Sequence, residues 1–143
     1  MASLNRTDFQ ILAVERLEDA KALASLGRYA AAFYLAGYSI ECALKACIAK
    51  RIQAGDWPPK PKVVQNEYYS HDLSALLKAA GLDTDLKSYA GISAVFAKNW
   101  ATVLDWTEER RYETAVPRQQ ADEMIAAIED ATDGILPWLR THY

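Results

Sequence analysis

The chain has 143 residues, of which 51% are hydrophobic and 24% charged, and its formal net charge is −3. This length suits a single domain over residues 1–143, and so high an apolar content excludes a chain that is disordered throughout. A sequence pI of about 5.4 argues against binding nucleic acid through bulk positive charge, although a local basic patch stays open.

The N-terminal residues, MASLNRTDFQ, lack the basic and then apolar order of a secretion signal. No apolar run approaches the roughly 20 residues that cross a bilayer. We therefore expect a cytoplasmic protein with no membrane partner. Cys42 and Cys47 are consistent with this, because their spacing on a helix turns them about 140° apart, which excludes a disulfide within that helix. We interpret both as small buried thiols.

Apolar residues recur at helical spacing along the first third of the chain and predict two long helices. The first helix takes Thr7 as its N-cap and ends before Gly27, a residue suited to the left-handed conformation that follows many helices. The second runs from about Arg28 to about Ala54, a length of roughly 40 Å. Because this second helix is apolar or small on most sides, we expect it to be the buried central helix of a bundle.

Residues 55–70, GDWPPKPKVVQNEYYS, contain three prolines and no helical period, so they predict a long connection. Trp57 in this segment either packs on the bundle or serves a partner. A short helix follows from about Asp72 to Ala80, with Gly81 as its C-terminal stop.

The remaining apolar pattern predicts two further long helices. One extends from residue 84 or 85 to 106 and contains Gly91, which loosens it. The segment WTEERRYETAVP interrupts the pattern, and Pro117 then suits the first turn of the last helix. Gly134 and Pro137 end or bend that helix and leave a packed tail. The fold class is therefore all-α, an up-and-down bundle of about five helices, four long and one short.

Two charged residues lie in the middle of the second helix. Glu41 and Lys45 are one turn apart on a face that is too apolar for an ordinary solvated surface. In one interpretation they compensate each other inside the bundle or reach Arg110 or Arg111. In the other they face a ligand. A pair of this kind that is buried should be far more sensitive to removal of one partner than a surface pair.

The residues that follow the third long helix include two adjacent arginines. Arg110 and Arg111 can bind a phosphate or a carboxylate as paired forks. The alternative is that they pair within the protein with Glu41, Glu108 or Glu109. Tyr112, which comes next, is a weak proton donor at neutral pH.

Other polar residues have mainly structural interpretations. Tyr34 and Tyr38 share the face of Glu41 and suit a subunit interface, where tyrosine is enriched. His71 is expected to cap the short helix or bond the backbone rather than to act as a base. The acidic residues of the last helix lie away from its apolar stripe, which predicts a solvated face rather than a metal site. We expect no metal and no cofactor, and the sequence has no phosphate-binding glycine loop.

Three segments together resemble the HEPN domain family. They read GRYAAAFYLAGYSIECALKACIAK from Gly27, SHDLSALLKAAGL from Ser70 and NW…LDWTEERRY from Asn99. The resemblance extends from roughly Glu15 to the end of the chain. It implies a helical bundle that pairs with itself. Many members of the family act beside a small nucleotidyltransferase, or as toxin or defence ribonucleases.

The chain departs from the catalytic pattern of that family, which is an arginine followed after four to six residues by a histidine. After Arg110 and Arg111 the sequence reads YETAVPRQQ, and His142 is about thirty residues further on. Metal-free RNA cleavage needs a group that both accepts and donates protons near neutral pH. Arginine stays protonated and cannot do this. Glu41 and Tyr112 are weak substitutes.

Three functions remain open at this point. The first is a homodimeric module that binds a nucleotide, RNA or a partner such as a nucleotidyltransferase or antitoxin, and that lacks the complete motif. The second is a metal-independent ribonuclease, a toxin or defence effector, that uses Arg110 or Arg111 with an atypical proton donor. The third is a purely structural oligomerisation unit.

Overall fold

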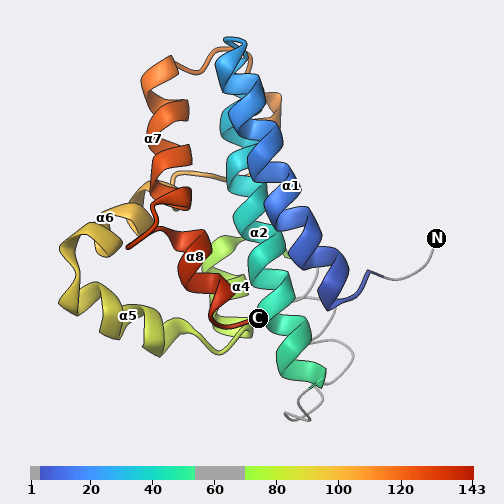
Figure 1. Ribbon diagram of the computed structural model, residues 1–143, viewed down its shortest axis with the longest axis vertical. Helices are drawn as coiled ribbons and strands as arrows, with labels where there is room; N and C mark the ends of the chain where they lie inside the picture. Colours follow the sequence, from blue (N-terminus) through green and yellow to red (C-terminus); the bar gives the residue numbers. More distant parts are fainter. Residues whose placement is uncertain (1–3, 54–69) are drawn as a thin grey trace.

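The computed structural model describes residues 4–53 and 70–143, and within these ranges it is helical without strands (Figure 1). The helices are α1 (Arg6–Ser25), α2 (Tyr29–Gln53), α4 (Leu73–Ala79), α5 (Asp83–Ile92), α6 (Ala94–Val103), the 3₁₀-helix η1 (Glu108–Tyr112), α7 (Arg118–Glu129) and α8 (Ile135–Arg140). This confirms the all-α bundle. The segment 55–69, with Trp57, and residue Ala54 lie outside the described residues.

Helix α1 begins at a different cap from the expected one. The Asn5 side chain accepts a hydrogen bond from the Asp8 backbone N–H at 2.9 Å, and the Asp8 carboxylate accepts one from the Asn5 N–H at 2.9 Å. This reciprocal capping box satisfies two free donors, so the assignment of Thr7 as N-cap was wrong. At the other end Gly27 has φ 78°, which confirms the left-handed turn between α1 and α2.

Helix α2 is the central helix, as the sequence predicts. Its middle turns are buried, and α1 lies antiparallel along it (Figure 1). The Ser39 hydroxyl donates a hydrogen bond to the Ala13 carbonyl at 2.5 Å, a backbone approach that small residues permit. Residues Tyr29–Ile52 are long and apolar enough to cross a membrane, contrary to the expectation from the sequence, but 78% of the most apolar window is buried. A buried core helix meets the same criterion.

The helix expected from residue 84 or 85 to 106 is two helices. Ser93 has an extended backbone (φ −112°, ψ 109°) and ends α5, while its hydroxyl accepts a hydrogen bond from the Phe96 N–H at 3.1 Å and caps α6. The break therefore falls at Ser93 and not at Gly91, because serine exchanges the helical backbone bond for a side-chain cap. The apolar spacing continues across the break, which is why it predicted one helix.

The last expected helix is also divided. Helix α7 ends at Glu129, and the Asp130 carboxylate accepts a hydrogen bond from the Asp133 N–H at 2.7 Å in the turn that follows. Residues expected to be a tail form α8, and Pro137 lies in its first turn, where the missing N–H has no helical partner to lose. These two divisions raise the number of α-helices in the described ranges above the expected five.

One core joins these elements. Its largest fully buried apolar side chains come from α2, α4, α6, α7 and α8: Phe33, Ile40, Leu44, Leu76, Phe96, Val103, Met124, Ile128, Ile135, Leu136 and Leu139. Helix α2 packs against α1, α4, α7, α8 and η1. The charged pair of α2 is buried within this packing.

Candidate functional site

The charged pair of α2 is enclosed. Glu41 is 1% exposed and Lys45 8%. The Lys45 ammonium lies 3.4 Å from Glu41 Oε2, at the limit of a hydrogen bond. The expectation that this face of α2 is not solvated is therefore confirmed. A buried carboxylate needs more than one weak partner, so the contacts of the second oxygen, Glu41 Oε1, have to be identified.

That second oxygen contacts His71. Glu41 Oε1 lies 2.8 Å from His71 Nδ1. His71 precedes α4, and the neighbouring Asp72 is the residue that caps this helix, accepting a hydrogen bond from the Ala75 N–H at 3.0 Å. The prediction that His71 caps or bonds the backbone was wrong, because Asp72 performs that role and leaves the imidazole free to turn toward α2.

The contacts continue from His71 to the protein surface. His71 Nε2 lies 3.5 Å from Glu108 Oε1, and the same Glu108 oxygen accepts a hydrogen bond from Arg111 Nη1. The Glu41 side chain is 2% exposed, whereas the side chains of His71, Glu108 and Arg111 are 43%, 31% and 43% exposed, so the contacts lead from the core to the surface. We call Lys45, Glu41, His71, Glu108 and Arg111 the charged chain.

Arg110 and Arg111 bind different partners and do not form one paired binding group. Arg110 forms a bidentate ion pair with Glu113, with Nη1 2.8 and 2.7 Å from the two carboxylate oxygens, and stacks over the Phe33 ring at 4.7 Å. Arg111 points to Glu108 and donates to the Tyr112 hydroxyl at 2.8 Å. Of the three partners that the sequence left open for the arginines, Glu108 is the one that Arg111 binds, which confirms that alternative. Neither arginine reaches Glu41, where His71 lies instead.

Trp106 fixes η1 against α2. Its indole N–H donates to the Tyr34 carbonyl at 2.9 Å, and its ring lies where any side chain on Gly37 would be. The Tyr34 ring packs on Trp106 and stacks on Tyr38, with centroids 5.7 and 6.2 Å away. Burial raises the pKa of Tyr38 to about 12, and burial with the nearby Glu41 raises the pKa of Tyr34. Both hydroxyls therefore stay protonated at neutral pH.

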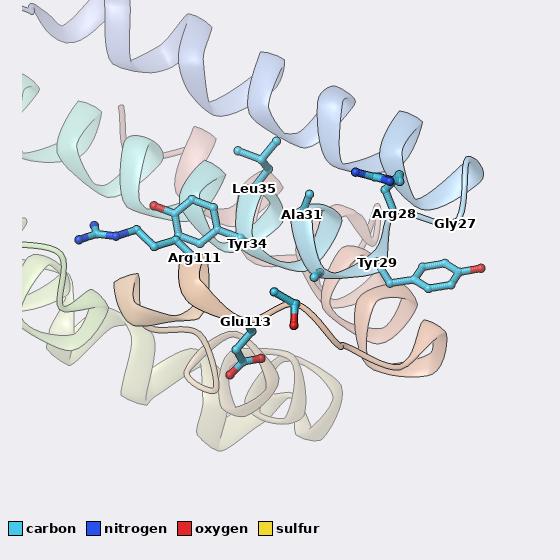
Figure 2. Close-up of a pocket in the computed structure, with 10 residues that line it drawn as sticks. Gly27, Arg28, Tyr29, Ala31, Tyr34, Leu35, Arg111 and Glu113 are labelled. Carbon is cyan, nitrogen blue, oxygen red and sulfur yellow. The ribbon is translucent and has the colours of Figure 1, made fainter.

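A groove runs along the first turns of α2 beside η1, with a volume of about 580 Å³. It is lined by Gly27, Arg28, Tyr29, Ala30, Ala31, Tyr34, Leu35, Arg111, Glu113 and Thr114. Figure 2 shows Arg28 and Arg111 at opposite ends, with Tyr34, Leu35 and Ala31 between them. We call this the α2 groove. Arg28 was not predicted from the sequence as a site residue, because its position at the mouth depends on the α1–α2 turn.

A second cleft, also of about 580 Å³, is lined in part by His71, Asp72, Trp106, Glu108 and Glu109. Arg111 lines the α2 groove, whereas His71 and Glu108 line this second cleft, so the charged chain connects the two. Within the described ranges no group of three or more His, Cys, Asp or Glu residues lies close enough to hold a metal ion.

The predicted site residues therefore fall into two sets. The structure brings Glu41, Lys45, His71 and Arg111 into one connected group, and Tyr34 and Tyr38 flank it. Arg110 belongs to a separate pair. Glu108 was expected only as a possible partner of the arginines, and its contact with His71 was not predicted. A glutamate three residues before Arg111 lies on the same side of a helical turn, which accounts for the first of these contacts.

The fold and the site define the class as an all-α bundle with a charged chain at one face of its central helix. The model of one protein family, the HEPN domain, matches residues 12–135. The chain therefore belongs to the HEPN domain family. No curated protein and no solved structure gave a significant match.

Proposed function

We propose that the protein is a homodimeric HEPN module that binds single-stranded RNA or a nucleotide along the α2 groove. The observation that carries this proposal is the arrangement in Figure 2, where arginines stand at both ends of a groove that has a tyrosine between them. Guanidinium groups bind phosphates, and tyrosine rings stack on bases without sequence preference.

The length of the groove favours a nucleotide strand over a single phosphate ion. Arg28 and Leu35, which both line the groove, are seven residues apart, or about 10 Å along a helix. Figure 2 shows Arg28 and Arg111 at opposite ends of the groove, so they are not placed to grip one phosphate together. Two separate phosphates of one strand fit this arrangement, with the net charge of −3 limiting binding elsewhere.

Binding can be measured by fluorescence anisotropy with a labelled single-stranded RNA. Arg28→Ala should weaken binding about threefold to tenfold, because one phosphate contact is lost, and should reduce the salt dependence of binding. Lys87→Ala is the matched control, since it removes one positive charge from α5, where the side chain is 75% exposed. Equal effects of the two changes, or no binding by the unchanged protein, would contradict the proposal.

The homodimer and a nucleotidyltransferase or antitoxin partner are part of the same proposal, and family membership supports them. Tyr34 and Tyr38 remain our candidates for the interface, because both are only partly buried in the single chain. Light scattering on the purified protein should give a mass near twice 15.9 kDa. Tyr38→Ala should shift that mass toward the monomer. A monomeric mass at high micromolar concentration would refute the dimer.

A metal-independent ribonuclease that uses Arg111 with an atypical proton donor is the second candidate. One observation favours it. The Glu108 carboxylate contacts both His71 and Arg111, although these two residues are forty positions apart in the chain. The structural arrangement thus brings a histidine to the arginine in space, where the sequence has none at the usual spacing. Arg110, bound to Glu113, is the weaker choice for this role.

A further inference from the structure

His71 has a carboxylate facing each of its two ring nitrogens. Nδ1 lies 2.8 Å from Glu41 Oε1, and Nε2 lies 3.5 Å from Glu108 Oε1. The two acids belong to different elements, Glu41 to α2 and Glu108 to η1, and the first is buried whereas the second is partly exposed. One titratable ring therefore lies at the junction of α2, η1 and the start of α4.

The number of protons on the ring decides which of these contacts is a hydrogen bond. A neutral imidazole has one N–H, and an imidazolium has two. The short contact with Glu41 keeps the proton of the neutral ring on Nδ1, because a buried carboxylate that loses a donor is destabilised. Nε2 of the neutral ring then turns a lone pair toward Glu108, whereas Nε2 of the imidazolium donates to it. The link from His71 to η1 therefore requires the second proton.

The same proton changes the charge beside the α2 groove. Two acids and two bases make up the rest of the charged chain, so its charges cancel when His71 is neutral. An imidazolium leaves one positive charge in excess. Glu108 then contacts two cations, His71 and Arg111, and neutralises Arg111 less completely. Because Arg111 lines the α2 groove, the groove becomes more favourable for an anion.

We propose that His71 is a pH-dependent switch of the α2 groove, and that the groove binds RNA more tightly when the ring carries its second proton. The inference rests on the proposed binding of RNA in that groove. Histidine is the side chain whose charge ordinarily changes between pH 5 and 8. Binding should therefore tighten as the pH falls from 8 to 6. One additional charge about 10 Å from a phosphate, at an effective dielectric constant of about 50, changes the binding constant about threefold.

The other ionisable groups in and beside the charged chain belong to residue types that ordinarily titrate outside the interval from pH 6 to 8. They are Glu41, Lys45 and Tyr34 on α2, Glu108, Glu109 and Arg111 on η1, and Asp72 before α4. The chain has two histidines. The second, His142, follows α8 and packs edge-on against the Trp138 ring, with centroids 4.7 Å apart, so it provides a matched control.

RNA binding by the full chain is measured at pH 6 and pH 8 and at constant ionic strength, by fluorescence anisotropy. The single-stranded RNA is labelled on a base and has no terminal phosphate, so that the RNA itself does not titrate. The unchanged protein and His142→Gln should bind about threefold more tightly at pH 6. His71→Gln, whose amide can donate to Glu41 but takes up no proton, should bind equally at both pH values. Glu108→Gln at pH 8 should match the unchanged protein at pH 6, because it also leaves one positive charge in excess.

A second measurement needs no RNA. The coupling between His71 and Glu108 is obtained from urea unfolding of His71→Gln, Glu108→Gln and the double variant. It should be present at pH 6 and absent at pH 8. Equal coupling at both pH values, binding by the unchanged protein that does not depend on pH, or the same pH dependence in His71→Gln would overturn the switch. Coupling at pH 6 alone, with no RNA binding at either pH, would refute the proposed function and retain the proton-dependent link to η1.

Discussion

Glu41 is the residue on which the site depends. Its carboxylate is almost fully buried, and it links Lys45 on the same helix to His71 before α4. The histidine alone is a common surface residue, and Arg111 alone is an exposed ion-pair partner. The buried Glu41 carboxylate, which lies 2.8 Å from His71 Nδ1, distinguishes this arrangement from a chance surface contact.

Glu41→Ala should destabilise the fold strongly. The change leaves Lys45, 8% exposed, without its carboxylate, and loss of one partner of a buried pair costs about 3–5 kcal/mol. Glu18→Ala, which breaks the exposed pair with Lys21, should cost less than about 1 kcal/mol. The free energies of unfolding from urea titrations measure both. Similar values for the two variants would show that the Glu41 pair behaves as a solvated one.

At the scale of elements, the position of η1 relative to α2 determines whether the charged chain can form. Trp106 sets this position through its hydrogen bond to the Tyr34 carbonyl and its contact with Gly37. Glu108 and Arg111 follow two and five residues after Trp106, so a displacement of the Trp106 indole would shift η1 and with it the contact between Glu108 and His71.

Gly37→Ala should therefore disturb both stability and site. An added methyl would collide with the Trp106 ring, and overpacking of this kind costs about 1–3 kcal/mol. Gly91→Ala is the matched control, because nothing lies near that position and an alanine in helix α5 should stabilise by about 0.5–1 kcal/mol. Thermal unfolding of the two variants should thus shift in opposite directions. A neutral Gly37→Ala would mean that Trp106 is not held as described.

The sequence was informative about elements to the extent that they depend on local patterns. The buried α2, the short α4 and the Gly27 turn follow from apolar spacing and glycine. The breaks at Ser93 and Asp130 were missed because the apolar stripe continues past them, and only a side-chain cap reveals the end. The link from Glu41 through His71 to Glu108 was missed for another reason. It joins three elements, and helical periodicity carries no information about which surfaces meet.

At the scale of the whole molecule, two thiols report on the packing around α2. Cys42 and Cys47 are nearly inaccessible, and the Cys47 thiol donates to the Leu139 carbonyl of α8 at 3.7 Å. Burial raises the pKa of each thiol to about 12, with Glu41 adding to the effect at Cys42. The folded protein thus holds both thiols protonated in a pH range where the unfolded chain ionises them.

Stability should consequently fall as the pH rises above about 9. Between the unfolded value near 9 and the folded value of about 12 the native state binds more protons, so the free energy of unfolding decreases with pH. Each thiol contributes about 1.4 kcal/mol per pH unit. Replacing both cysteines by alanine removes this contribution, and urea titrations at pH 8, 9 and 10 should show a shallower decline for the double variant. Parallel declines would indicate that the thiols ionise in the folded protein, and that the packing of α1 and α8 on α2 is looser than this structure describes.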